Sequence, residues 1–372
     1  MNHSVYLPDY DNSILGIPNS ILAHYGATPH HTPLPILSKQ MSKGYKNIVL
    51  LILDGMGIEI LKTHAPDGFL MKNCVAGISS VYPCTTTSAI TTFETGLTPL
   101  EHGWLGWSMY FKEIGKCVDL FTGHHTGTEN MATEKNIAWK TAGYKNLFDQ
   151  ITKADPSVGC YRVSPYSDKY QTDTNEAVCK HIKTLCKKDG RKYISAYHFQ
   201  PDTDIHEYGC NCERVKADVV LFDMQIQKLA DNLNDTLLII TADHGQTDVE
   251  ELMVENFPEI NECLAVPLTR EPRSLSFYIK PEYLEIFPKR WEHRFGNDFM
   301  LMTSAEALEK GFFGKGTPHS RIKDFLGDYV ALATGNKFLW YRYKKGEAHG
   351  FKAHHAGLRY EEMVVPLILI ER

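Results

Sequence analysis

The stretch Asn47-Ile-Val-Leu-Leu-Ile-Leu-Asp54-Gly55 decides the fold of this chain. A short, nearly continuous apolar run predicts a β-strand that is buried on both faces of a sheet. An aspartate directly after such a strand lies at the edge of the sheet, and the glycine behind it lets the backbone turn sharply. Asp54 is therefore a candidate functional residue, although an aspartate in this place can also cap a helix.

More apolar runs follow the same pattern, and segments with helical periodicity separate them. We expect strands at residues 157–164, 193–199 and 236–242, and helices at residues 146–154, 174–187 and 212–233. This alternation is typical of an α/β fold with a doubly wound, mostly parallel sheet and helices on both faces. Active sites of such sheets gather at the carboxyl ends of the strands, so residues far apart in the sequence can meet there.

The chain of 372 residues is long enough for one large domain, and we interpret residues 1–372 as a single catalytic domain. Residues from about 250 to 325 are less regular. We expect them to form a small inserted α/β subdomain, or cap, because candidate ligand residues lie on both sides of them. Residues 329–334, 338–343 and 364–370 are expected to return to strands.

Composition excludes several classes of protein. The formal net charge is −6 and neither half of the chain is basic, which argues against a nucleic-acid polymer as partner. No apolar run reaches membrane-spanning length, and the N-terminus lacks the features of a signal peptide. The nine cysteines are scattered, as free thiols in a reducing compartment are. We therefore expect a cytoplasmic protein without a membrane partner, and the composition indicates no oligomeric state.

Acid and histidine pairs mark three further segments as metal-site candidates. Asp202 and His206 stand four residues apart in PDTDIHEYG, which places them on one face of a helical turn. Asp243 and His244 follow an apolar run, and the next residue, a glycine, lets the backbone leave the strand so that both side chains can reach one metal. His355 lies in AHHAGL, where His354 and His349 compete with it as ligands.

Mixed carboxylate and imidazole ligation suits zinc first, then manganese or iron. Two divalent metals about 3.5–4 Å apart would polarise a phosphoryl oxygen and activate a nucleophile. The candidate nucleophiles are Thr85, Thr86, Thr87 and Ser88, in VYPCTTTSAITTFETG. The same residues also suit the start of a helix, and both interpretations can hold because a helix N-terminus favours a phosphate group.

Together these motifs resemble the alkaline phosphatase superfamily, and within it the type I phosphodiesterase/nucleotide pyrophosphatase family. The resemblance rests on LILDGMG, on VYPCTTTSAITTFETGLTPLEHG, on PDTDIHEYG, on TADHGQTD and on HHAGLRYEEMVVPLI. They cover residues 47–105, 193–248 and 349–366. Aligned on Val81-Tyr82-Pro83 and on Thr95-Gly96, the nucleophile of that family falls on Thr86.

The resemblance implies an alkaline phosphatase-like fold and two metal ions, zinc above all and manganese as an alternative. It implies one ion held by Asp202, His206 and His355, and a second held by Asp54, Asp243 and His244, with Thr86 also bridging toward the phosphoryl group. It further implies that Thr86 attacks phosphorus in line to give a phosphothreonine, which is then hydrolysed.

Two residues depart from the family pattern. Our alignment places Ala89 where the family has an asparagine that holds a phosphate oxygen, and Gln246 where the family motif D-H-G-M has methionine. Trp104 and Trp107 follow the nucleophile segment closely. We favour packing of this loop onto the core, and a wall on which a base or an aromatic leaving group stacks is the alternative interpretation.

The sequence therefore predicts a two-metal phosphoric ester hydrolase with a threonine nucleophile, of the phosphodiesterase/nucleotide pyrophosphatase kind. Its substrate would be a small phosphate ester, with nucleotides as candidates. A phosphomonoesterase or a phosphosugar mutase of the same superfamily is the alternative. A metal-binding protein without catalytic activity is a second alternative, against which the full set of ligands and the threonine argue.

Overall fold

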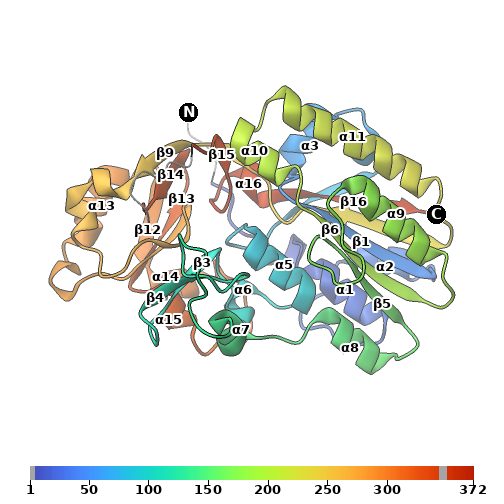
Figure 1. Cartoon of the computed structure of the whole chain (residues 1–372), viewed down its shortest axis with the longest axis horizontal. Helices are drawn as coiled ribbons and strands as arrows, with labels where there is room; N and C mark the ends of the chain where they lie inside the picture. The colour runs from blue at the N-terminus through green and yellow to red at the C-terminus, as the bar shows by residue number, and fades with distance from the viewer. Residues whose placement is uncertain (1–4, 343–349) are drawn as a thin grey trace.

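The computed structural model describes residues 5–342 and 350–372, which form two six-stranded sheets side by side (Figure 1). The main sheet has the strand order β2-β16-β7-β1-β6-β5. Its strands are β1 (Asn47–Leu53), β2 (Cys74–Ser79), β5 (Gly159–Val163), β6 (Lys192–His198), β7 (Thr236–Thr241) and β16 (Val364–Glu371).

Four neighbouring strands of the main sheet, β5, β6, β1 and β7, run parallel. The last strand, β16, lies antiparallel between β7 and β2. Every residue of β1 and β7 is buried, as expected for strands covered on both faces. The expected α/β fold with a mostly parallel sheet is confirmed.

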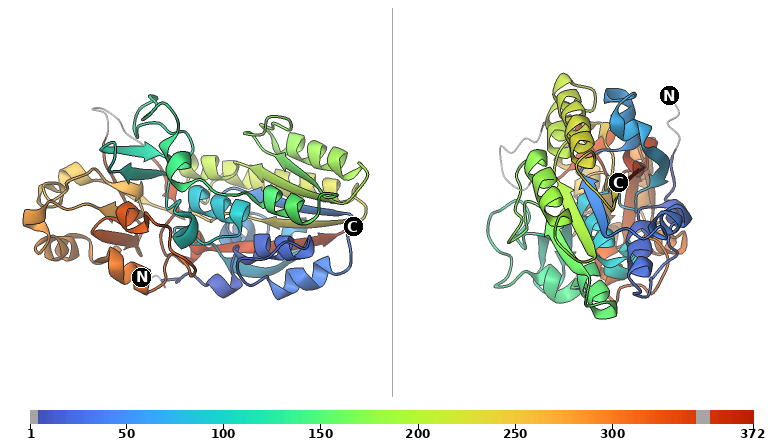
Figure 2. Two further views of the ribbon diagram at one scale, coloured as in Figure 1. Left: turned by 90° about the horizontal axis from the view of Figure 1, so that it is seen from below. Right: turned by 90° about the vertical axis from the view of Figure 1, so that its right-hand side faces the viewer.

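Helices cover both faces of the main sheet (Figures 1 and 2). One face carries α3 (Ile58–His64), α4 (Phe69–Lys72), α9 (Asn175–Cys186), α10 (Asp202–Tyr208) and α11 (Glu213–Ala230), which contact one another. The other face carries α1 (Gly16–His24), α2 (Pro35–Met41), α5 (Thr86–Thr95) and α8 (Leu147–Ala154). The helices expected at residues 146–154, 174–187 and 212–233 correspond to α8, α9 and α11.

The second sheet is antiparallel at every pairing and has the order β12-β13-β11-β10-β3-β4. Its strands are β3 (Ser108–Phe111), β4 (Lys116–Asp119), β10 (Thr269–Glu271), β11 (Ser274–Phe277), β12 (Phe299–Thr303) and β13 (Tyr329–Ala333). The region from about 250 to 325, expected as an inserted subdomain, supplies only part of it. The β3–β4 hairpin, which follows the threonine segment in the sequence, also belongs to this sheet, because β10 pairs with β3 through Arg270 and Ser108.

Short elements complete the chain and connect the two sheets. The helices are α6 (Pro99–His102), α7 (Ile137–Ala142), α12 (Pro258–Asn261), α13 (Phe287–Phe295), α14 (Ser304–Glu309), α15 (Ile322–Leu326) and α16 (Tyr360–Met363), with single turns at Tyr10–Asn12, Val254–Asn256 and Pro281–Tyr283. Two small sheets pair β9 (Glu250–Met253) with β14 (Lys337–Trp340) and β8 (Thr247–Asp248) with β15 (Ala353–His354). The second of these pairs carries the segment of His355 back to the end of β7.

Within residues 5–342 and 350–372, none of the helices combines the length and the apolar character that crossing a membrane requires. All nine cysteines are free thiols, and five of them are at least partly exposed.

Candidate active site

The candidate ligands meet because their strands are neighbours. Asp54 follows β1, which pairs with β7 on one side and with β6 on the other. Asp243 and His244 follow β7, and Asp202 opens α10 just after β6. Parallel strands end at one edge of a sheet, so the three segments converge there, as the sequence predicts.

Two glycines allow the chain segments to approach this closely. Gly55 has a φ of 70°, and a Cβ atom built on it would lie 2.9 Å from the Cα atom of Asp202. A Cβ atom on Gly245 would lie 2.1 Å from the carbonyl oxygen of Glu361. Side chains at either position would push the ligand-bearing turns apart, because real Cβ atoms do not approach other atoms to less than about 3 Å.

The structure brings the six candidate ligands together in two groups. Within each group the ligand atoms all lie within 4.8 Å of one another, and the groups are Asp202, His206 and His355, and Asp54, Asp243 and His244. These are the two sets that the resemblance implies. The rings of His244 and His355 stack with centroids 3.8 Å apart, so the two groups adjoin.

Burial and charge make this cluster suited to cations. Asp54 and Asp243 are buried, and Asp54 Oδ1 and Asp243 Oδ2 have no hydrogen-bond partner among the described residues. Burial and the neighbouring carboxylates of Asp243 and Asp202 raise the pKa of Asp54 well above its ordinary value. Burial and His244 lower the pKa of His355, which keeps its imidazole neutral, the form that binds metals. Buried carboxylates with unmet acceptors and neutral imidazoles fit a divalent-metal site.

Neighbouring groups hold the ligands in place. His206 Nδ1 lies 2.9 Å from the carbonyl oxygen of Ala353, which leaves Nε2 for a metal. The side-chain amide of Gln246 donates to Asp202 Oδ1 at 2.6 Å and to the Asp202 carbonyl at 3.1 Å. The hydroxyl group of Tyr197 donates a hydrogen bond to the carboxylate of Asp54.

Of the four candidate nucleophiles, Thr86 alone contacts the ligand cluster. It is the first residue of α5, it is half-buried, and its Oγ1 lies 3.2 Å from His244 Nε2. Thr85 Oγ1 donates to Glu271, and Ser88 Oγ donates to the carbonyl oxygen of Trp104. The side chain of Thr87 is fully buried. The threonine segment thus starts a helix, as one interpretation expects, and it also presents Thr86 to the cluster.

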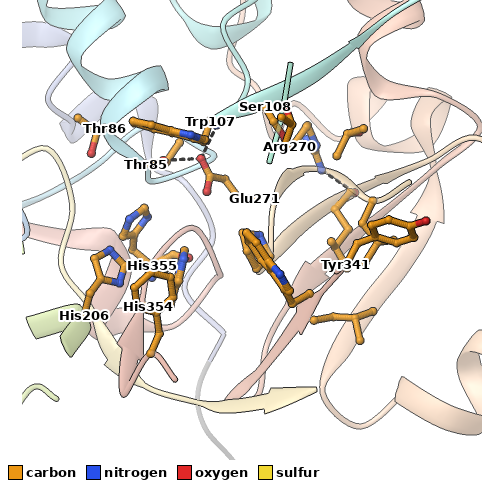
Figure 3. A pocket seen from close by; sticks show the side chains of 18 of the residues that line it. Thr85, Thr86, Trp107, Ser108, His206, Arg270, Glu271, Tyr341, His354 and His355 are labelled. Atoms are coloured by element: carbon orange, nitrogen blue, oxygen red, sulfur yellow. Dashed lines mark hydrogen bonds between the residues drawn. The ribbon is translucent and has the colours of Figure 1, made fainter. Parts of the chain in front are cut away.

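A cavity of about 330 Å³ opens beside Thr86 and the histidines (Figure 3). Residues of both sheets line it. They include Thr85, Thr86, Asp202, His206, His354 and His355 near the ligand cluster, and Trp107, Thr126, Leu268, Arg270, Glu271, Leu275, Trp340, Tyr341 and Phe351 farther out.

The two tryptophans lie in different surroundings. Trp107 lines the cavity and is 46% exposed. Trp104 is fully buried in the core beneath the second sheet, and its indole Nε1 donates to the carbonyl oxygen of Ala142 at 2.7 Å. The structure thus brings Trp107 to the site and gives Trp104 the packing role.

Two further expectations concern Ala89 and the competing histidines. Ala89 is fully buried in the core of the main sheet and does not line the cavity, so an asparagine there would not face the site. The alignment that put the family asparagine at this position is therefore not supported. His354 Nδ1 accepts a hydrogen bond from the backbone N–H of His355 at 2.9 Å, and His354 belongs to neither ligand group. His349 lies outside the described residues.

Glu271 is the site residue that sequence reasoning missed. It belongs to β10 of the second sheet, it is only 3% exposed, and its Oε1 accepts from Thr85 Oγ1 at 2.7 Å and from the Trp107 N–H at 2.6 Å. Burial raises its pKa to about 7, although these two hydrogen bonds act in the opposite direction. Its stretch, Thr-Arg-Glu-Pro-Arg, resembles an exposed loop and carries no signal of burial.

Comparison with known proteins agrees with this geometry. No curated protein matches the sequence significantly. Solved structures share the fold: murine ectonucleotide pyrophosphatase/phosphodiesterase 5 has 17% identity and a TM-score of 0.62, over 87% of this chain and 88% of that one. An inactive threonine-to-alanine variant of the murine protein in complex with AMP has 17% identity and a TM-score of 0.61, over 86% and 87%. Its human counterpart has 15% identity and a TM-score of 0.65, over 87% of each chain.

The family model that matches the chain covers most of it. Its description is type I phosphodiesterase/nucleotide pyrophosphatase, and it matches residues 48–350. The match takes in Asp54, Thr86, both ligand pairs and β10. The expected relation to the alkaline phosphatase superfamily is confirmed, and the chain belongs to the type I phosphodiesterase/nucleotide pyrophosphatase family of metal-dependent hydrolases.

Proposed function

We propose that this chain is a two-metal phosphodiesterase in which Thr86 is the nucleophile. The observation that carries the proposal is the position of Thr86 Oγ1, 3.2 Å from His244 Nε2 at the start of α5. One metal ion would be held by Asp202, His206 and His355, and the other by Asp54, Asp243 and His244. When bound, the ions supply positive charge that polarises the phosphoryl group and lowers the pKa of a nearby hydroxyl.

The chemistry follows from what surrounds Thr86. Its hydroxyl oxygen attacks phosphorus, so that a Thr86 O–P bond forms while the bond from phosphorus to the leaving oxygen breaks. The proton of Thr86 ends on the alcohol that leaves. Water then attacks phosphorus, the Thr86 O–P bond breaks, and a proton from the water restores the Thr86 hydroxyl while the phosphate monoester leaves. The backbone N–H groups in the first turn of α5 favour the negative charge of the phosphoryl group throughout.

One observation supports diesters over monoesters, and a second points to nucleotides. The cavity extends from Thr86 along β10 and β14, which gives a second ester group a place to bind. The structurally similar murine protein, in its inactive threonine-to-alanine form, is in complex with AMP. Nucleotide diesters are therefore candidate substrates, and zinc is the metal we propose, with manganese as the alternative.

The test uses protein loaded with zinc or manganese and compares bis-p-nitrophenyl phosphate with p-nitrophenyl phosphate. We expect the diester to be the better substrate, and we expect Thr86→Ala to lose at least about a thousandfold in kcat because the nucleophile is gone. Metal content, measured by elemental analysis, should stay unchanged in this variant.

Thr87→Ala is the matched control, since Thr87 is the next residue along α5 and its side chain is buried away from the cluster. Undiminished turnover in Thr86→Ala would exclude Thr86 as the nucleophile. A clear preference for the monoester would shift the assignment to a phosphomonoesterase of the same superfamily.

We also propose a cytoplasmic location. Its support is the set of nine free thiols, which is typical of a reducing compartment. A thiol reagent that cannot cross membranes should leave Cys179 and Cys212, which are partly exposed, unlabelled in intact cells. Labelling before lysis would place the protein outside the cell.

A further inference from the structure

The helix α11 is apolar on two faces. Its inner face is buried in the core of the main sheet and contains Val215, Val219, Phe222, Ile226 and Leu229. Its outer face carries a second apolar set, which we call the outer stripe: Ala217, Val220, Leu221 and Met224. A helix that covers a sheet normally presents polar side chains to water on its outer face, so the outer stripe departs from this rule.

The outer stripe is continuous and accessible. Its members stand three and four residues apart, so they are neighbours on the helix surface. Val220 is 39% exposed, Leu221 is 47% exposed and Met224 is 63% exposed, and Ala217 is exposed as well. Figure 1 shows α11 on the outside of the molecule. Single exposed apolar residues are common on proteins, whereas a contiguous row of them is typical of an interaction surface.

The two ends of the outer stripe carry opposite charges. Glu213 stands four residues before Ala217, and Lys228 stands four residues after Met224, so each charge lies one helical turn beyond the stripe on the same face. The side chain of Glu213 is 90% exposed, with Lys216 at 3.6 Å, and Lys228 is exposed. A partner that fits must therefore be apolar in the middle, basic near Glu213 and acidic near Lys228.

A second copy of α11 meets these requirements when it lies antiparallel to the first. A two-fold axis between Val220 and Leu221 makes the two helices equivalent, so every facing pair occurs twice. The small alanine then lies opposite the large methionine, and each end of the stripe meets the opposite charge. The facing pairs are Glu213 with Lys228, Ala217 with Met224, and Val220 with Leu221.

The remaining charges of α11 agree with this orientation. The other exposed cations, Arg214 and Lys216, face Gln227 and Gln225 in the antiparallel pair, so exposed like charges do not meet along the two helices. A parallel pair would instead place each charged end against the same charge of the second copy, which is unfavourable. The charge pattern thus distinguishes the two orientations.

We propose that the outer stripe is a dimerisation surface and that its occupant is α11 of a second copy of this chain, antiparallel about a two-fold axis. One pair of helices buries less than the roughly 1,200 Å² of a stable interface. We therefore expect a reversible dimer with a dissociation constant on the order of 10–100 μM. The inference does not rest on the proposed function, because the cavity beside Thr86 is lined by residues outside α11.

Sedimentation velocity of the full chain tests the proposal. Between about 1 and about 300 μM, a range that brackets weak interfaces, the mean mass should rise from 42.2 kDa toward twice that value. Leu221→Glu should raise the dissociation constant at least about tenfold, because it buries a carboxylate against apolar side chains.

Ile286→Glu is the matched control. Ile286 is 43% exposed, close to the value for Leu221, and it precedes α13, which lies at the far end of the molecule from α11 (Figure 1). Its dimerisation should equal that of the wild type. Circular dichroism and urea denaturation show that both glutamate variants are folded.

Exchange of the end charges tests the orientation. At low salt, where exposed charges are least screened, Glu213→Lys and Lys228→Glu should each weaken the dimer about three- to tenfold, because each sets like charges opposite one another at both ends. The double variant restores opposite charges in the antiparallel pair. Its dissociation constant should return to within about threefold of the wild-type value.

Three outcomes would overturn the proposal. A wild type that stays monomeric at the highest concentration would leave the outer stripe to a partner of another kind. Dimerisation that Leu221→Glu does not weaken would place the contact on another surface. Dimerisation that each single charge variant weakens and the double variant does not restore would exclude the antiparallel pairing of Glu213 with Lys228.

Discussion

At the scale of single residues, Gln246 shows how a departure from a family motif acquires a role. Its amide donates to both the carboxylate and the carbonyl oxygen of Asp202, so the side chain fixes the orientation of a candidate metal ligand. Partners of this kind orient metal ligands and raise affinity.

Replacing Gln246 by methionine, the residue of the family motif, should keep the volume and remove both hydrogen bonds. We expect the affinity of the site formed by Asp202, His206 and His355 to fall about 10–100-fold. Competition with a chromophoric zinc chelator measures it, with exposed Gln227 of α11 replaced by methionine as the control. Equal zinc affinity of Gln246→Met and the wild type would show that the amide only fills space.

Glu271 makes stability depend on pH. Its pKa is raised to about 7 in the folded chain, against an ordinary value of 4.5, so the folded state binds the proton more tightly than the unfolded state. The contribution of protonated Glu271 to the free energy of unfolding is therefore fully present below pH 4.5, and it is lost as the pH rises through 7. Glu271→Gln removes this loss, so its stability relative to the wild type should increase by up to about 3 kcal/mol between pH 5 and pH 8.

Urea denaturation of the metal-free proteins at the two pH values measures this difference. Metal-free protein is required because bound cations would hold Glu271 in its charged form. A difference between variant and wild type that does not change with pH would contradict a raised pKa at this position.

The sequence predicted some residues of the site and not others, for identifiable reasons. Asp54, Asp243 and Asp202 follow apolar strands, and a strand end fixes where a residue lies in an α/β sheet. Glu271 gave no such signal, because its burial comes from pairing with β3, more than 150 positions earlier in the chain. Trp104 and Trp107 stand three positions apart, and tertiary packing alone decides that one is core and the other cavity wall.

At the scale of elements, the site depends on the close approach of three segments: the turn after β1, the turn after β7, and α16 with Glu361. Gly57 and Gly245 touch, since a Cβ on Gly57 would lie 2.6 Å from the Cα of Gly245. Arg270, next to Glu271, and Ala356, next to His355, have left-handed backbones with φ of 73° and 82°. Such conformations cost energy in residues other than glycine, and packing of the surrounding turns holds them in place.

Gly245→Ala should therefore displace Asp243 and His244. A Cβ there would lie 2.1 Å from a carbonyl oxygen, so we expect a loss of about 3 kcal/mol in unfolding free energy and a lower metal content. Gly190→Ala is the control, because that glycine has a φ of 80° and open space around it, and should cost about 1 kcal/mol without loss of metal. Full metal content in Gly245→Ala would show that the turns adjust.

Element prediction from sequence worked for the buried strands and for the edge strand β5, expected at residues 157–164, and failed at the opposite edge of the main sheet. The buried strands β1, β6 and β7 were expected within one or two residues of their observed ends. The edge strand β2 was not, because its first four residues are not fully buried and include exposed Val75. The hairpin of β3 and β4 was not predicted. The segment that holds Trp104 and Trp107 was interpreted as a packed loop or a stacking wall, and not as two paired strands.

At the scale of the whole molecule, a buried ion pair ties the second sheet to the end of the chain. Arg273, at the turn between β10 and β11, donates two hydrogen bonds of 2.7 Å to Glu362 of α16, and both side chains are inaccessible to solvent. Glu362 also accepts from the Gly357 N–H at 2.8 Å. The pair thus links β10, which carries Glu271, to the segment that carries His355.

Arg273→Leu should cost about 3–5 kcal/mol, because it leaves the Glu362 charge buried without a partner. Adding Glu362→Gln should recover part of this loss, since the amide removes the charge and still accepts from Gly357. Urea denaturation measures both, and Arg290→Leu, which breaks an exposed pair with Glu262, should cost less than about 1 kcal/mol. Equal stability of the Arg273 and Arg290 variants would contradict a structural role for the buried pair.

The position of Glu271 has a consequence for how such enzymes diversify. Thr86 and the candidate metal ligands belong to the main sheet and its loops, whereas Glu271 belongs to a short hairpin of the other sheet. Glu271 also lines the cavity beside Thr86, so variation in that hairpin changes the wall that a bound ester group meets, while the candidate ligands belong to other segments. Libraries that vary position 271 and keep Arg273 leave the buried ion pair with Glu362 in place, so they separate changes in the cavity wall from loss of the fold.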